Sequence, residues 1–325
     1  SGIGKISITG KTKGSGNVNA QGISAYGAGA MVLRSANTSA QAISLVGDAS
    51  AVTGGSASLG VNFAGTIEAT GTGGGISITG TAGTATTDVA TTLGGSILSK
   101  SGPITLVGNN DSAHLGINFG STTLGFKAGS NVLTSSSAIT LKADQIGYGT
   151  TAVNTTGTVG IYSLDASNIF ANAQTLPSTF TLDAGVSGLT IGKTTNTSGI
   201  TLDKAISISG PISIYGGDIA LNANLTSTRS TSAITATATG KITLASSKTV
   251  QTAFGNITFT ASSAGGTAGG IVLNSSSSLI SFGGNITLGG GYTGTLGAGL
   301  YSATANAPGI SMASNTIDAA GGNIN

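Results

Sequence analysis

The sequence predicts an all-β protein, specifically a right-handed parallel β-helix with about three short strands per turn and with loop or hairpin insertions. Three observations favour this fold. One phrase is repeated three times near the C-terminus. Short segments throughout the chain alternate apolar and polar residues and are bounded by Gly, Asn, Asp or Ser, as strands separated by turns are. No stretch shows helical periodicity over the ten or so residues that a helix needs.

The repeated phrase occupies residues 240–259, 270–288 and 309–324. Each copy holds three short alternating segments, and Gly-Asn-Ile opens the third segment every time. In the first copy the segments start at Ile242, Val250 and Ile257, and the steps within all copies are seven or eight residues. The steps between copies are 14 and 24 residues. Such spacing predicts a three-sided coil with two tight corners and one corner that accepts insertions.

The Gly-Asn-Ile triplets supply two sets of predicted structural residues. They are the turn glycines Gly255, Gly284 and Gly322 and the asparagines Asn256, Asn285 and Asn323. The glycines are expected where the backbone turns, because glycine accepts a positive φ at little cost. The asparagines are expected to stack as an internal ladder through their side-chain amides, as in cross-β assemblies.

The whole chain, residues 1–325, is interpreted as one β-helical domain. Its sub-repeats are predicted near 3–72, 73–133, 179–239 and 240–325. An irregular insertion is expected near 145–178, where aromatic residues are densest. This insertion is interpreted as a loop or hairpin packed over an edge of the main body, the alternative being a surface decoration that contacts a partner. The absence of an initiator Met and the unfinished last segment favour a fragment of a longer chain or a processed product.

Composition excludes several functional classes. The chain of 325 residues has 38% hydrophobic residues and only four Pro, which argues against disorder. Its net charge of +2 is spread thinly, and the cluster of Lys5, Lys11 and Lys13 is interpreted as a solvated face, so no nucleic-acid partner is expected. The lack of cysteine excludes disulfides and thiolate metal sites. No run approaches the roughly 18 apolar residues of a membrane helix, so no membrane insertion is expected.

No catalytic, cofactor-binding or metal-binding residue is predicted. Aspartates recur about every twenty residues, at Asp144, Asp165, Asp183, Asp203 and Asp218. They are interpreted as turn residues at strand ends. The sole histidine, His114, is interpreted as a surface loop residue, and Glu68 is given no role.

Two alternatives stay open. A polysaccharide-degrading β-helix enzyme would bring Asp183, Asp203 and Asp218 together in one groove. A carbohydrate-binding module would align tyrosines as a stacking platform. The tyrosines concerned are Tyr148, Tyr162, Tyr215, Tyr292 and Tyr301.

The phrases Gly-Asn-Ile-Thr-Leu and Gly-Lys-Ile-Thr-Leu, joined by Ser/Thr/Ala/Gly-rich spacers, resemble the shafts of filamentous-haemagglutinin-like bacterial exoproteins and the β-helices of autotransporter passengers. The resemblance covers nearly the whole chain, although the Asn-Pro-Asn-Leu type signature of that family's secretion domain is not in this sequence. It implies two-partner secretion, an extracellular or cell-surface location, and roles in cell adhesion, extracellular filaments or biofilm.

We therefore expect a non-catalytic structural shaft that displays loops, such as 289–308 and 145–178, for attachment. The expected partners are carbohydrate or protein receptors on host cells, bacteria or matrix. Self-association end to end is also expected, through the strand edges near Ile6 and Ile324, because open β-edges template pairing.

Overall fold

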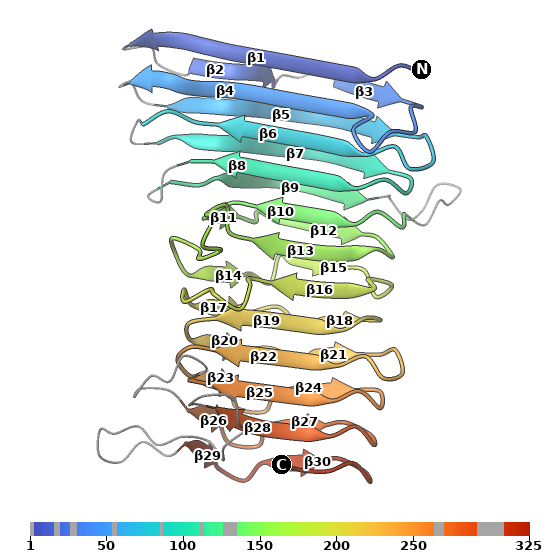
Figure 1. Cartoon of the computed structure of the whole chain (residues 1–325), viewed down its shortest axis with the longest axis vertical. Coiled ribbons are helices and arrows are strands. Elements are labelled where there is room, and N and C mark those ends of the chain that lie inside the picture. Colours follow the sequence, from blue (N-terminus) through green and yellow to red (C-terminus); the bar gives the residue numbers. More distant parts are fainter. Residues whose placement is uncertain are drawn as a thin grey trace. The chain divides into compact units, whose positions relative to one another are not determined.

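The computed structural model of the chain describes residues 3–15, 20–26, 31–53, 57–84, 87–110, 114–125, 135–262, 270–290 and 309–325. All elements named within these ranges are β-strands, and none of the ranges contains a helix that could cross a membrane. The chain forms two compact units, Ser1–Ala166 with Thr179–Asp183, and Ser167–Ser178 with Ala184–Asn325. Within each unit the strands stack side by side, and all pair in parallel (Figure 1). The predicted parallel β-helix is confirmed.

The first unit is built from two parallel sheets. Sheet 1 runs β1 (Ile6–Ser15), β4 (Ile43–Thr53), β6 (Ile76–Thr81), β8 (Ile104–Asn109), β10 (Ile139–Lys142) and β13 (Thr158–Tyr162). Sheet 2 runs β2 (Ala20–Ala25), β5 (Ser58–Ala69), β7 (Val89–Ser99), β9 (Ile117–Gly125), β12 (Thr150–Asn154) and β15 (Phe180–Leu182). Two further strands join sheet 2, β3 (Met31–Ser35) beside β5 and β11 (Ile146–Gly147) beside β9.

Turns of the first unit differ from the predicted three short strands. β5 pairs with β2 along its first half and with β3 along its second half, so two expected strands are merged into one. β7 and β9 continue this long side. β5 pairs with β7 without a gap from Val61 to Ala69. In β7, Gly95 has a φ of 88°, and the register of β7 against β9 shifts beside it, as at a β-bulge.

The core of the first unit consists of identical or similar side chains in register. Ile43, Ile76, Ile104 and Ile139 are stacked partners in sheet 1, each at most 1% exposed. The predicted copies 3–72 and 73–133 thus each contain two sheet 1 strands, one pair starting at Ile6 and Ile43 and the other at Ile76 and Ile104. All four strands carry nearly the same sequence. Sequence similarity alone therefore could not show whether one repeat corresponds to one turn of the coil or to two.

A column of glycines brings the two sheets of the first unit into backbone contact. Gly10, Gly47, Gly80 and Gly108 are partners in sheet 1. A Cβ atom added at Gly80 would lie 1.9 Å from the carbonyl oxygen of Ala90 on sheet 2, and the same approach recurs at the other three. Only glycine fits such a contact. The glycine column therefore sets the distance between the sheets.

The second unit has three strands per turn, each in a different sheet. Sheet 3 contains β16 (Gly188–Ile191), β19 (Ile212–Gly216), β22 (Ile234–Ala238), β25 (Ile257–Ala261) and β28 (Ile286–Gly290). Sheet 4 contains β14 (Gln174–Leu176), β17 (Ile200–Leu202), β20 (Ile219–Leu221), β23 (Ile242–Leu244), β26 (Ile271–Leu273) and β29 (Ile310–Met312). Sheet 5 contains β18 (Ile206–Ile208), β21 (Leu225–Ser227), β24 (Thr249–Thr252), β27 (Ser278–Ile280) and β30 (Thr316–Asp318).

The three C-terminal copies stack in the register that their sequence spacing predicts. Ile242 pairs with Ile271, which pairs with Ile310. Val250 pairs with Leu279, which pairs with Ile317. Ile257 pairs with Ile286, which bridges to Ile324. The inward residues of the first two copies are fully buried, because alternate residues of a strand point to opposite faces of its sheet.

The stretch 145–178 is not the loop or hairpin that was expected. It contributes β11, β12 and β13 to the first unit and β14 to the second, all paired in parallel with other strands. Inward residues of these strands, such as Val153, Ile161 and Leu176, are fully buried. The strands are two to five residues long. The predicted C-terminal strands are equally short, but this stretch lacks the repeated Gly-Asn-Ile phrase that marks their spacing.

Candidate functional site

The Gly-Asn-Ile triplets form one corner of the second unit, between sheets 5 and 3, which we call the asparagine corner. Asn256 Oδ1 accepts a hydrogen bond from the backbone N–H of Asn285 at 2.8 Å, and Asn285 Oδ1 accepts one from the backbone N–H of Asn323 at 2.9 Å. Both bonds are exposed. The asparagines are therefore stacked, but they form a surface ladder from side chain to main chain rather than an internal amide ladder.

The glycines of the asparagine corner act by close approach and not by positive φ. A Cβ atom at Gly284 would lie 2.1 Å from the carbonyl oxygen of Gly255, and one at Gly322 would lie 2.2 Å from that of Gly284. The positive φ falls earlier in each corner, on residues such as Phe254 (65°) and Phe282 (50°). The stacked backbones leave no room for a side chain at the glycines, which explains their recurrence.

Buried hydroxyl groups complete this corner, and sequence reasoning missed them. Thr252 Oγ1 donates to the carbonyl oxygen of Gly255 at 2.6 Å, and Ser281 Oγ donates to the carbonyl oxygen of Gly284. Both side chains are fully buried. Each hydroxyl satisfies a carbonyl that the turn removes from the sheet ladder. The detectable signal was a Ser or Thr three residues before the corner glycine in the first two copies; the third copy has Ala319 there.

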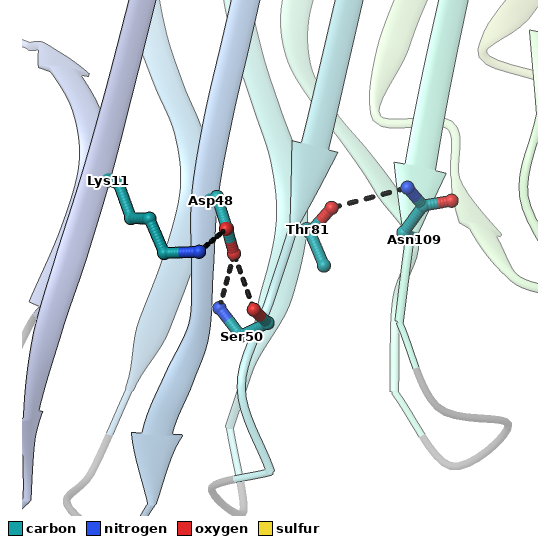
Figure 2. Close-up of polar contacts among 5 residues, drawn as sticks. All are labelled: Lys11, Asp48, Ser50, Thr81 and Asn109. Carbon is teal, nitrogen blue, oxygen red and sulfur yellow. Dashed lines mark hydrogen bonds and ion pairs between the residues drawn. The ribbon is translucent and has the colours of Figure 1, made fainter.

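A second polar ladder crosses sheet 1 of the first unit (Figure 2). Lys11, Asp48, Thr81 and Asn109 are partners on successive strands. Lys11 Nζ lies 2.6 Å from Asp48 Oδ2, and Asn109 Nδ2 donates to Thr81 Oγ1 at 3.2 Å. Each of the four directly follows a glycine of the glycine column, a signal visible in the sequence. Lys11, which was interpreted as part of a solvated face, is more than half exposed and also forms an ion pair with Asp48.

Asp48 is the carboxylate of this ladder, and three hydrogen-bond donors surround it. The Lys11 ammonium donates to it, and the hydroxyl and backbone N–H of Ser50 donate to Oδ1 at 2.5 and 2.9 Å. These donors, Lys11 first, lower the pKa of Asp48 from 3.8 to about 2. Glu68, to which no role was assigned, forms a comparable cross-strand pair, since Arg34 Nε lies 2.6 Å from its Oε2.

Asp48 is expected to make stability depend on acid pH. Because its pKa is depressed in the folded protein, its contribution is present above pH 3.8 and is lost as the pH falls through about 2. In Asp48→Asn the free energy of unfolding, measured by urea denaturation, should fall less between about pH 4 and pH 2 than in the wild type. Equal acid dependence in the two proteins would contradict this assignment.

The structure separates two of the three aspartates proposed for a carbohydrate-cleaving groove, Asp203 and Asp218, which both belong to the second unit. Asp183 belongs to the first unit. Asp203 follows β17 and its Oδ1 accepts a hydrogen bond from Asn222 Nδ2 at 2.8 Å. Asp218 precedes β20, the parallel neighbour of β17. The two carboxylates therefore lie at opposite ends of the sheet 4 strands.

Three tyrosines of the platform considered for a carbohydrate-binding module, Tyr148, Tyr162 and Tyr215, lie within the described residues. Tyr148 is only 4% exposed, and its ring packs edge-on against Phe180 with ring centroids 5.0 Å apart. Tyr162 and Tyr215 lie on strands of different units. Tyr292, Tyr301 and the expected insertion 289–308 from residue 291 onward lie outside the described residues. At least one member of the proposed platform is thus a core residue.

The hydroxyl of Tyr148 is buried without a hydrogen-bond partner among the described residues. Burial raises the pKa of this hydroxyl above its ordinary value of 10.0. Tyr148→Phe keeps the ring contact with Phe180 and removes the unpaired hydroxyl. It is expected to increase the free energy of unfolding by about 1 kcal/mol, measured by urea denaturation. A decrease would show that the hydroxyl has a stabilising partner in solution.

Within the described ranges, no three His, Cys, Asp or Glu side chains are grouped so that they could hold a metal ion. The molecule that these features define is a parallel β-helical protein whose corners and faces carry polar ladders. Neither a protein-family model, nor a curated protein, nor a solved structure matches the chain.

Proposed function

We propose that this chain is a non-catalytic segment of the shaft of a secreted or cell-surface bacterial adhesin or extracellular filament. The observation that carries the proposal is the parallel pairing within each unit, where like side chains stack on like from turn to turn. Such stacking is suited to a mechanical element, because every turn is joined to the next by rows of backbone hydrogen bonds and by a continuous apolar column.

The ladders support the same role. Each turn of a parallel stack adds about 4.8 Å, so length is set by the number of turns. At the asparagine corner, side chains of one turn bond to the backbone of the next turn at the surface, and Lys11 and Asp48 join side chains of successive turns. A register slip by one residue would break these bonds and turn the core residues outward. The polar ladders therefore select one register.

The extracellular location rests on the sequence resemblance to haemagglutinin-like shafts. Among the alternatives, the opposite placement of Asp203 and Asp218 gives no support to a carbohydrate-cleaving groove between them. End-to-end association through the terminal strands stays a prediction.

Immunogold electron microscopy of intact producing bacteria, with antibodies raised against the purified chain, tests the proposal. Labelling of the cell surface or of extracellular fibres is expected, and external protease should remove it. Labelling confined to the interior of sectioned cells would overturn the proposal. So would release of reducing sugar ends when the purified chain is incubated with polysaccharides.

A further inference from the structure

Two phenylalanine side chains are exposed at the asparagine corner of the second unit. Phe254 is 62% exposed and Phe282 is 44% exposed. They belong to successive turns, since β24 and β27, which lead into this corner, pair with each other. The Phe254 ring reaches the backbone of the next turn, because a Cβ atom added at Gly283 would lie 3.3 Å from Phe254 Cδ1. The two residues therefore form one exposed apolar patch across two turns, which we call the phenylalanine strip.

The fold does not require aromatic residues at this corner. Phe254 and Phe282 have φ values of 65° and 50°, in a region that is unfavourable for bulky side chains. The corners of the neighbouring turns adopt the same conformation with smaller residues, Thr231 at 66° and Ala320 at 46°. Glycine or asparagine would be less strained there. Aromatic side chains that are both strained and exposed point to a contact with another molecule.

Opposite charges flank the phenylalanine strip. Arg229 lies in the corner of the preceding turn, where its carbonyl oxygen accepts a hydrogen bond from the Ser232 N–H at 3.1 Å. Asp318 leads into the corner of the following turn, where its Oδ1 accepts a hydrogen bond from the Ala320 N–H at 2.9 Å. Both residues are exposed, and neither has an ion-pair partner among the described residues. Four successive turns thus carry, in order, a cation, two phenylalanines and an anion along one edge.

We propose that this edge binds the same edge of a second copy of the chain in an antiparallel, two-fold arrangement. A two-fold axis between Phe254 and Phe282 places each phenylalanine against the other phenylalanine of the second copy. It also places Arg229 of each copy opposite Asp318 of the other, because both charges lie about the same number of 4.8 Å turns from the axis. A parallel arrangement would oppose like charges. An edge that is complementary to itself when reversed favours a second copy over an unrelated partner.

The contact is small, so the association is expected to be weak. Four phenylalanine rings of about 150–250 Å² each supply no more than about 1,000 Å², the lower limit for a stable interface. Dilute protein is therefore expected to be monomeric. The contact acts between chains that are already held close together, because tethering raises their effective concentration. This inference goes beyond the proposed shaft role, and it uses a lateral surface rather than the terminal strand edges.

Sedimentation equilibrium of the purified chain, from micromolar to millimolar concentration, tests the proposal. The wild type should show a monomer–dimer equilibrium. Phe254→Ala is expected to raise the Kd for dimerisation by at least about tenfold, because it removes a central aromatic contact. Arg229→Asp and Asp318→Arg should each raise the Kd similarly, because each opposes like charges. Lys241→Asp makes the same change in net charge as Arg229→Asp but precedes β23 of sheet 4, so this matched control should leave the Kd unchanged.

A mixture of the two charge variants tests the antiparallel geometry. An equimolar mixture of Arg229→Asp and Asp318→Arg restores an attractive pair at both ends of the strip. It should therefore form a heterodimer with a Kd close to that of the wild type. A mixture that associates no more tightly than either variant alone would overturn the proposal. So would a wild type that stays monomeric throughout, or association that Phe254→Ala leaves unchanged.

Circular dichroism melting curves establish that the variants are folded. If Asp318→Arg is not folded, the comparison of Arg229→Asp with Lys241→Asp decides, and equal Kd values for these two variants would contradict the proposed contact. None of these measurements depends on where the chain is located on the bacterium. The lateral contact and the shaft role therefore fail separately.

Discussion

Gly80→Ala is expected to lower the free energy of unfolding of the first unit by about 3 kcal/mol or more. The added Cβ atom would lie 1.9 Å from the Ala90 carbonyl oxygen and 2.4 Å from Thr91 Oγ1. A backbone carbonyl cannot turn aside as a flexible side chain can. Sheets 1 and 2 would have to separate, and the buried contacts on either side of the glycine column would be loosened. Urea denaturation monitored by circular dichroism measures the loss.

Gly94→Ala is the matched control for this prediction. Gly94 lies in β7 of the same unit, and a Cβ atom there would meet nothing closer than Ala64 Cβ at 3.6 Å. This variant should be neutral, or more stable by about 0.4–1 kcal/mol, because alanine restricts the unfolded chain more than glycine does. Equal destabilisation by the two variants would mean that loss of glycine flexibility, and not contact between the sheets, is responsible.

Phe259→Ala is expected to destabilise the second unit by about 3–5 kcal/mol. Phe259 is 0% exposed in β25 and is stacked between Ala236 and Leu288 of the neighbouring turns. Its removal leaves a cavity that the small Ala236 cannot fill. The measurement is again the urea midpoint and slope, which separate a change in stability from a change in the surface exposed on unfolding.

Phe254→Ala provides the comparison within the same turn. Phe254 is 62% exposed at the asparagine corner and has a φ of 65°. Its truncation should change the free energy of unfolding by no more than about 0.5 kcal/mol. A large loss at this position would show that the exposed ring is buried in solution by a contact with another molecule. The pair of variants thus separates core packing from an external interface.

The C-terminal register could be predicted because its physical cause is local. When three short strands are joined by tight corners, the number of residues between successive strand starts can vary little. Gly-Asn-Ile also marks the same corner in each copy. The strand pairing of the first unit could not be predicted in the same way. Its neighbouring turns are nearly identical in sequence, and whether β2 and β3 stay separate or merge opposite β5 depends on pairing between distant segments. Local propensity carries no information about such pairing.

For the candidate sites too, the sequence predicted some features and only the tertiary structure revealed others. The sequence by itself determined the all-β class, the parallel stacking of the C-terminal copies and the corner residues Gly284 and Asn285, because alternation and fixed spacing are properties of the chain. Only the tertiary structure decided that Gly284 is needed for close approach, that Asn285 bonds to backbone, that Lys11 meets Asp48, and that Asp203 and Asp218 stand apart. Those outcomes depend on which turn lies next to which, and this is settled by packing of the whole stack.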